Sequence, residues 1–271
     1  MAPKDPSIQT SEMPITQSAL ATLLSTMRLH VHIPYRFPGG RIYLDVAESP
    51  MMLARALGNY EVQKLAAVRQ FLKPGQTFID VGVNKGDFSL VAARILGASG
   101  RVLAFEPEPT NCKWIEKSIR LNEYTNVRLF PVALSDKSGT ADLYLGRKSG
   151  WHSLLAGQAG RDCGRITVAT RTLDEIVDEE LHESSVDLVK IDVEGAEMHV
   201  LRGAADTLRK NPAVTLLIDI HPDMGVNPKA VCDGLREQGF TVFRETPPFN
   251  IPVGDDSMVK SIVAKRMAAA S

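Results

Sequence analysis

The sequence predicts an α/β fold built on a largely parallel sheet. From Thr77 onward, short apolar segments of strand type alternate with helical patterns, which is the pattern expected when helices cover both faces of such a sheet. Residues 188–191 are apolar apart from one lysine, as is typical of strands that are buried on both sides. We predict seven strands, at residues 77–81, 101–105, 127–132, 187–192, 214–220, 240–244 and 258–265.

Two parts are predicted along the chain. Residues 1–73 form an N-terminal extension with a helix near 18–29, a short strand at 41–44 and a helix near 60–72 that ends at a Lys-Pro-Gly turn. Residues 74–271 form the main domain.

An insertion at residues 138–174 interrupts the predicted strands. It carries two segments of alternating polarity, 140–145 and 166–172, and between them a Gly-rich stretch with Trp151 and His152. A long irregular segment inside a compact domain is either a lid over a substrate or a surface hairpin. The sequence leaves both interpretations open.

Charge and composition exclude several classes of partner. Lys and Arg total 31 against 32 for Asp and Glu, so there is no overall field to hold nucleic acid or an anionic membrane. Three scattered cysteines without a Cys-x-x-Cys pair indicate free thiols, buried or half-buried, in a reducing compartment. The polar first sixteen residues and the lack of a long apolar segment predict a cytoplasmic protein without a membrane span. A helix at residues 20–27 offers a contact for a homo-oligomer.

The most informative turn follows the first predicted strand of the sheet. It carries Asp80, Gly82, Asn84 and Gly86, and the next strand ends at Glu106. Parallel sheets bind nucleosides at this edge. Only two glycines are present, whereas a dinucleotide fingerprint has three. A carboxylate at position 80 repels a pyrophosphate but suits the ammonium of S-adenosylmethionine (SAM).

Glu106 completes this interpretation, because its carboxylate is placed to accept both ribose hydroxyls of SAM. The alternatives are an ordinary strand-turn-helix corner capped by Asp80 and an NAD-dependent oxidoreductase, against which the missing glycines argue.

Three further groups of polar residues follow predicted strands. Ser135 and Asp136 either bind an adenine edge or form a turn. Asp192 and Glu194 project to the same side if the backbone stays extended, and two such carboxylates perturb each other's pKa or recruit a cation. Glu197 is assigned to the first turn of the following helix, where it complements the helix dipole.

The last of these strands ends at Asp219 and His221. We predict that His221 is a general base and that Asp219 orients it. His221 is also consistent with a packing or capping role.

Taken together, these motifs resemble those of FkbM-type SAM-dependent methyltransferases. The resemblance rests on residues 78–86, Phe105-Glu106-Pro107, Ala133-Leu134-Ser135-Asp136, Thr172-Leu173-Asp174, the string Lys-Ile-Asp-Val-Glu-Gly-Ala-Glu at 190–197 and Leu201-Arg202-Gly203, and it extends over residues 60–244. It implies a Rossmann-like class I methyltransferase fold of seven mostly parallel strands with the last antiparallel. It also implies O-methylation of a sugar, glycan or natural-product hydroxyl.

The resemblance also implies roles for individual residues. Asp80, Gly82, Asn84 and Gly86 bind the methionine end of SAM, Glu106 with Pro107 the ribose, and Ser135 with Asp136 the adenine, while Tyr60 and Glu61 lie on a helix that caps the cofactor. The chain departs from the family pattern at Lys85, where a small or apolar residue is usual, and at Asp219, where Glu is usual.

The predicted catalytic set is His221, Asp192 and Glu194, with the two carboxylates contacting the acceptor hydroxyl. A divalent cation on Asp192 and Asp219 is the less favoured alternative. The competing functions are a SAM-binding scaffold without catalysis and methylation of an amine, a protein or RNA.

Overall fold

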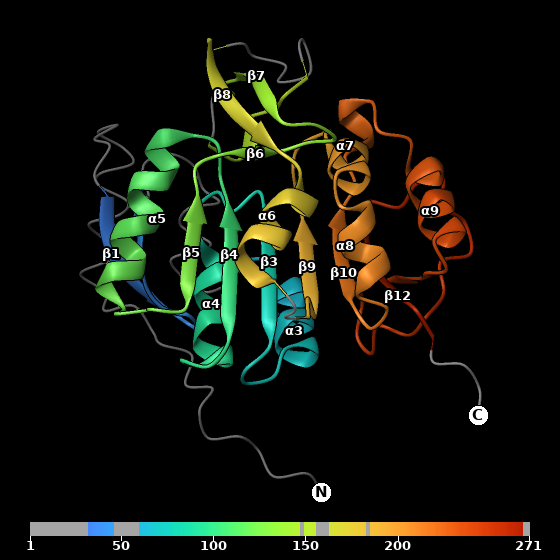
Figure 1. The fold of residues 1–271 in the computed structure, drawn as a ribbon, viewed down its shortest axis with the longest axis horizontal. Coiled ribbons are helices and arrows are strands. Elements are labelled where there is room, and N and C mark those ends of the chain that lie inside the picture. The colour runs from blue at the N-terminus through green and yellow to red at the C-terminus, as the bar shows by residue number, and fades with distance from the viewer. Residues whose placement is uncertain (1–31, 46–59, 147–148, 156–162, 183–184, 268–271) are drawn as a thin grey trace, which may run out of the picture.

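The central sheet has the predicted number and direction of strands. The computed structural model describes residues 32–45, 60–146, 149–155, 163–182 and 185–267. Seven strands pair in the order β11-β12-β10-β9-β3-β4-β5 (Figure 1). Their bounds are Thr77–Val81 (β3), Arg101–Phe105 (β4), Val127–Phe130 (β5), Leu188–Ile191 (β9), Thr215–Asp219 (β10), Thr241–Arg244 (β11) and Ser261–Lys265 (β12).

The last strand, β12, runs antiparallel to both of its neighbours, and the remaining pairs are parallel. The predicted α/β fold class is therefore confirmed, with its antiparallel last strand. β5 ends at Phe130 rather than at residue 132, because Pro131 has no N–H to donate to a neighbouring strand.

Helices cover both faces of this sheet, as predicted. Four helices pack on one face, where Ile79 and Val81 point: α6 (Leu173–Leu181), α7 (Glu197–Arg202), α8 (Ala205–Lys210) and α9 (Pro228–Glu237). Three helices pack on the other face, where Phe78 and Val102 point: α3 (Val62–Phe71), α4 (Asp87–Leu96) and α5 (Pro109–Leu121). Alternate strand residues thus enter different cores, which explains why the strands are apolar throughout.

Local sequence signals fix where these helices begin. The Glu108 carboxylate accepts hydrogen bonds from the N–H groups of Thr110 and Asn111, and Pro109 occupies the first helical position of α5. Thr172 and Glu175 form a reciprocal capping box at the start of α6. Both arrangements satisfy N–H groups that a helix leaves unpaired at its N-terminus.

The N-terminal extension contributes a hairpin rather than the single predicted strand. Strands β1 (His32–Phe37) and β2 (Gly40–Asp45) pair antiparallel, and Tyr35, Ile42 and Leu44 pack against Leu90 of α4. The predicted helix at 18–29 and the dimer contact at 20–27 lie outside the described residues.

The insertion forms a small sheet of its own. Its two predicted alternating segments are β7 (Gly139–Tyr144) and β8 (Arg165–Arg171), which pair antiparallel, while the short strand β6 (Ala133–Leu134) pairs parallel with β8. A 3-10 turn, η1 (Ser149–Trp151), lies between β7 and β8. In Figure 1 this sheet lies above the carboxyl ends of the central strands.

Two predictions from composition can be compared with the structure. Among the described residues, no helix is both long enough and apolar enough to cross a bilayer. The three cysteines are free thiols, but Cys163 is exposed, so the prediction that all are buried or half-buried is wrong for this one. Cys163 lies in the insertion, two residues before β8 begins.

Two glycines provide a test of the packing between α7 and the strand-end loop after β6. A Cβ on Gly203 would lie 2.0 Å from the Ser135 carbonyl oxygen, whereas a Cβ on Gly234, in α9, meets no atom within 4 Å. We expect Gly203→Ala to lower the free energy of unfolding by about 1–3 kcal/mol through overpacking. Gly234→Ala should raise it by about 0.5–1 kcal/mol, because alanine favours a helix interior. Urea unfolding of both variants measures this difference, and equal stabilities would contradict the close approach.

Candidate functional site

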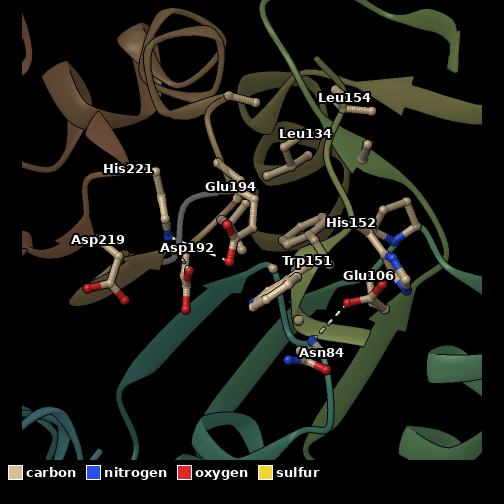
Figure 2. Close-up of a pocket in the computed structure, with 18 of the residues that line it drawn as sticks. Asn84, Glu106, Leu134, Trp151, His152, Leu154, Asp192, Glu194, Asp219 and His221 are labelled. Carbon is tan, nitrogen blue, oxygen red and sulfur yellow. Dashed lines mark hydrogen bonds and ion pairs between the residues drawn. The ribbon is translucent and has the colours of Figure 1, made fainter. Parts of the chain in front are cut away.

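One cavity lies at the carboxyl ends of β3, β4, β9 and β10 (Figure 2). Its volume is about 370 Å³, which is within the usual range for small-molecule sites. Its wall includes predicted site residues from distant parts of the sequence: Tyr60, Glu61, Gly82, Asn84, Glu106, Pro107, Asp192, Glu194, Asp219 and His221.

The turn after β3 forms one end of this cavity. Gly82 has φ 81° and Asn84 has φ 55°, values in the left-handed region that glycine and asparagine tolerate best. A Cβ on Gly82 would lie 1.9 Å from the Asp192 carbonyl oxygen. Glycine at position 82 is therefore required by the close contact between the β3 and β9 strand ends.

Glu106 is held in this end of the cavity by backbone donors. Its Oε2 accepts a hydrogen bond from the Asn84 N–H at 2.7 Å, and its Oε1 accepts one from the Glu108 N–H at 3.0 Å. Burial raises the pKa of Glu106 to about 7, although both backbone hydrogen bonds favour the charged form. The carboxylate is thus fixed in position and changes its charge near neutral pH.

Asp80 and Gly86 do not line the cavity. Asp80 is buried in β3, where it accepts a hydrogen bond from the Ser89 hydroxyl at 2.6 Å. Its Oδ1 lies 3.6 Å from the Nζ of Lys190, the residue beside it in β9. Gly86 caps α4. Binding of the methionine end of a cofactor by these two residues stays a prediction.

The Lys190 ammonium lies between charged and polar groups at the carboxyl ends of β3 and β9. Its Nζ also lies 3.4 Å from Asp192 Oδ2 and 3.5 Å from the Gly82 carbonyl oxygen. Burial lowers the pKa of Lys190, but the charges of Asp192 and Asp80 outweigh this effect and raise it. The ammonium therefore stays charged beneath the cavity.

The other end of the cavity brings together the three predicted catalytic side chains. His221 Nε2 lies 3.6 Å from Asp192 Oδ1 and 3.6 Å from Glu194 Oε1 (Figure 2). The expectation that an extended backbone aligns the two carboxylates is wrong, because Glu194 has φ 50°. The two carboxylates approach His221 from either side of this left-handed turn. The Glu194 carbonyl oxygen accepts a hydrogen bond from the Ser153 hydroxyl at 2.7 Å.

The carboxylate in contact with His221 Nδ1 is Glu197, and not Asp219, which we predicted to orient the ring. His221 Nδ1 lies 2.5 Å from Glu197 Oε1. Asp219 instead pairs with Lys64 of α3, whose Nζ also lies 3.1 Å from Glu61 Oε1. Glu197 occupies the first turn of α7, as predicted, but its side chain is fully buried and also contacts His221.

This cluster raises the pKa values of His221, Glu194 and Asp219. Burial lowers the pKa of His221, but the hydrogen bond to Glu197 and the charges of Glu194 and Asp192 raise it to about 9. Burial raises the pKa of Glu194 to about 7, although the charge of His221 acts to lower it. Burial and the charge of Asp192 raise the pKa of Asp219. In the ligand-free site His221 is therefore protonated at neutral pH.

Two sets of side chains have the composition of a cation site. Asp192, Glu194 and His221 form one set, and Glu61, Asp192 and Asp219 form the other, each with its ligand atoms within 4.8 Å of one another. Carboxylates suit a hard divalent ion. However, the Lys64 ammonium contacts both Glu61 and Asp219, so an ion in the second set would have to displace it.

Ser135 and Asp136 also lie outside the cavity wall. Residues of β6 pair with β8, and beyond them the Asp136 carboxylate pairs with His199 at 3.3 Å. The apolar residues just before them, Val132, Ala133 and Leu134, line the cavity. Adenine binding by Ser135 and Asp136 stays a prediction.

The insertion, for which the sequence left a lid and a surface hairpin both open, forms part of the cavity wall. Gly150, Trp151, His152 and Leu154 line the cavity. Figure 2 shows the Trp151 ring between Glu106 and the Asp192–Glu194 pair. Lys85, the first departure from the family pattern, is buried against Asn111 and does not line the cavity.

The comparison with known families agrees with this geometry. A family model described as the methyltransferase FkbM domain matches residues 80–242, which is more than half of the chain. The chain belongs to the FkbM methyltransferase family. Family membership sets aside the oxidoreductase alternative, and it agrees with the strand-end cavity and with the two-glycine turn.

Individual relatives are similar to this FkbM chain over part of its length. The 2-O-methyltransferase NoeI of Sinorhizobium fredii is 31% identical over 152 residues, covering 51% of this chain and 61% of its own length. The methyltransferase sdnD of Sordaria araneosa is 29% identical, covering 64% and 76%. Among solved structures, a SAM-dependent methyltransferase from Aquifex aeolicus aligns with a TM-score of 0.42 and 15% identity, covering 73% of this chain and 86% of that one.

The buried lysine of this site can be tested through stability. We expect Lys190→Met to lower the free energy of unfolding by about 3–5 kcal/mol, because it leaves the buried Asp80 carboxylate without a counter-charge. Adding Asp80→Asn should recover much of the loss. The control is Lys210→Met, which breaks an exposed pair with Asp178 and should change stability by less than about 1 kcal/mol. Denaturant unfolding gives all four values; strictly additive effects of Lys190→Met and Asp80→Asn would contradict the pairing.

Proposed function

We propose that this protein is a SAM-dependent O-methyltransferase that modifies a hydroxyl group of a small molecule, such as a sugar, a glycan or a natural product. The observation that carries the proposal is the cavity itself, with Glu106 at one end and His221, Asp192 and Glu194 at the other. The name of the relative NoeI, a 2-O-methyltransferase, supports an oxygen acceptor.

The side chains of the cavity suit the cofactor. The fixed Glu106 carboxylate supplies two acceptor oxygens for ribose hydroxyls, and Val132, Ala133 and Leu134 supply an apolar surface for adenine. Six carboxylates line the cavity against two lysines, which favours a cationic ligand. Tyr60 and Glu61 lie in the wall before α3 and cover the cofactor from that side.

SAM carries its methyl group on a sulfonium cation, and an in-line attack by the acceptor oxygen leaves the S–CH₃ electron pair on sulfur as the acceptor loses its proton. His221 Nε2 is the proposed proton acceptor, and Asp192 or Glu194 binds the acceptor hydroxyl. A protonated His221 cannot do this. The entry of a second cation into the cavity lowers the pKa of His221, so the base form becomes available when the site is loaded.

We further propose that the insertion acts as a substrate cover rather than as an independent surface hairpin. Gly150, Trp151, His152 and Leu154 line the same cavity as Glu106 and His221, and Ser153 is hydrogen-bonded to the Glu194 backbone. An aromatic ring at this position excludes water and offers a face on which a sugar ring can stack.

Cofactor binding is tested by calorimetric titration with S-adenosylhomocysteine (SAH). Glu106→Ala should weaken SAH binding by about tenfold or more, because one hydrogen bond to a charged acceptor contributes about 1.5–3 kcal/mol. Glu116→Gln, on the exposed side of α5, should leave the affinity unchanged. Wild-type affinity should fall as the pH drops below about 7, where Glu106 gains a proton, and this dependence should vanish in Glu106→Gln. No SAH binding by the folded wild type would refute the cofactor assignment.

The role of His221 is tested by comparing binding with turnover. His221→Ala should bind SAH like the wild type but transfer methyl groups about 10²–10⁴-fold more slowly, the usual contribution of a general base. Transfer from labelled SAM is measured against a panel of sugars, phenols and amines. His182→Asn, at an exposed position, is the control. Wild-type turnover in His221→Ala would remove His221 from the mechanism, and SAH binding without transfer to any acceptor would favour the scaffold alternative.

A further inference from the structure

Glu197 is a buried carboxylate that the proposed chemistry does not yet use. It is the first residue of α7, and its side chain is fully buried. Burial of a carboxylate costs several kcal/mol unless charges or hydrogen bonds compensate it. The helix dipole alone does not explain this burial, because an exposed carboxylate in the first turn obtains the same stabilisation without desolvation.

The contacts of Glu197 point to one partner. Oε1 accepts a hydrogen bond from the Gly195 N–H at 3.2 Å and lies 2.5 Å from His221 Nδ1. Among the described residues, Oε2 has no hydrogen-bond partner. The one side chain that Glu197 touches through a charge-assisted hydrogen bond is therefore the proposed base.

This contact determines which ring nitrogen faces the cavity. A carboxylate at Nδ1 holds the proton on that nitrogen, so that neutral His221 presents an unprotonated Nε2. Nε2 is the nitrogen that lies 3.6 Å from both Asp192 and Glu194. Without Glu197, the carboxylates of Asp192 and Glu194 would instead favour the tautomer that carries its proton on Nε2.

We propose that Glu197 is the positioning residue for His221: it fixes the ring orientation and the tautomer in which Nε2 receives the proton of the acceptor hydroxyl. This inference rests on the proposed function, because it assigns a partner to the base of that reaction. One proton moves from the acceptor oxygen to Nε2, and Glu197 stabilises the resulting imidazolium without itself taking a proton.

Several other charged groups lie around His221 and also influence its pKa. Asp192 and Glu194 face it from the loop after β9, and Asp219 lies at the end of β10. Asp223 in the turn after His221, Lys64 on α3 and Lys260 before β12 line the same cavity. These groups stay unchanged in variants of Glu197, so a change in the His221 titration reports the loss of the Glu197 contact.

The test uses NMR of the full chain labelled with ¹⁵N-histidine, which reports the protonation of each ring nitrogen and needs no acceptor. His221→Ala identifies the signals of His221. Glu197→Gln keeps the shape and removes the charge, so the midpoint of His221 should fall by about one to three units. Glu197→Ala removes the acceptor as well, so neutral His221 should shift its proton toward Nε2.

An unchanged midpoint in Glu197→Gln, or an unchanged tautomer in Glu197→Ala, overturns the proposal. Asp206→Asn is the matched control, because Asp206 also occupies the first turn of a helix, α8, but its side chain is exposed and pairs with Arg209. Asp206→Asn should leave the His221 signals as in the wild type. SAH titration of the wild type separates the two failures: no binding overturns the proposed function and this inference with it, whereas normal binding with unaltered ring signals in both Glu197 variants overturns the role of Glu197 alone.

Discussion

The buried ammonium of Lys190 is the interaction on which the site depends most. It lies between Asp80 of β3 and Asp192 after β9, two carboxylates whose mutual repulsion would otherwise separate adjacent strand ends. Its third neighbour is the Gly82 carbonyl oxygen, which belongs to the turn that leads to Asn84 and Glu106. One side chain thus fixes the spacing between the cofactor end and the acid-base end of the cavity.

Charge is distributed in pairs around this centre. Lys64 pairs with Asp219 and Glu61, and His221 pairs with Glu197, while Asp192 is shared by Lys190 and His221. These pairs offset part of the charge, but carboxylates still outnumber lysines in the cavity wall. A cationic cofactor changes this balance, because it adds positive charge to a cluster in which His221 holds a removable proton. Under the proposed function, cofactor binding and deprotonation of His221 are therefore parts of one equilibrium.

The sequence predicted the sheet well, because its strands are buried on both faces and are apolar throughout. It also located Gly82, Asn84, Glu106, Asp192 and His221, since each follows a strand whose carboxyl end must lie at the same edge of the sheet. It could not identify the partners of these residues. A glutamate at the start of a helix looks the same whether it is exposed, like Glu175, or buried, like Glu197.

Contacts between segments that are distant in the sequence could not be predicted either. Lys64 meets Asp219 across 155 positions of the sequence, and no local pattern records such a pairing. Lys190 did carry a signal, because a lysine in the middle of an apolar strand requires buried counter-charges. The left-handed backbone at Glu194 gave none, since glutamate rarely adopts it.

The hydrogen bond from the Ser153 hydroxyl to the Glu194 carbonyl oxygen joins the insertion to the loop that follows β9. The turn after β3 is packed too closely against Asp192 to accept a side chain at position 82, whereas β7 and β8 of the insertion have both exposed and buried residues. Because Ser153 anchors the insertion to this loop, a change in the shape of the insertion also changes how the Glu194 backbone is held. Replacing the insertion to reshape the cavity will therefore also move the Glu194 backbone, unless the serine that anchors it is kept.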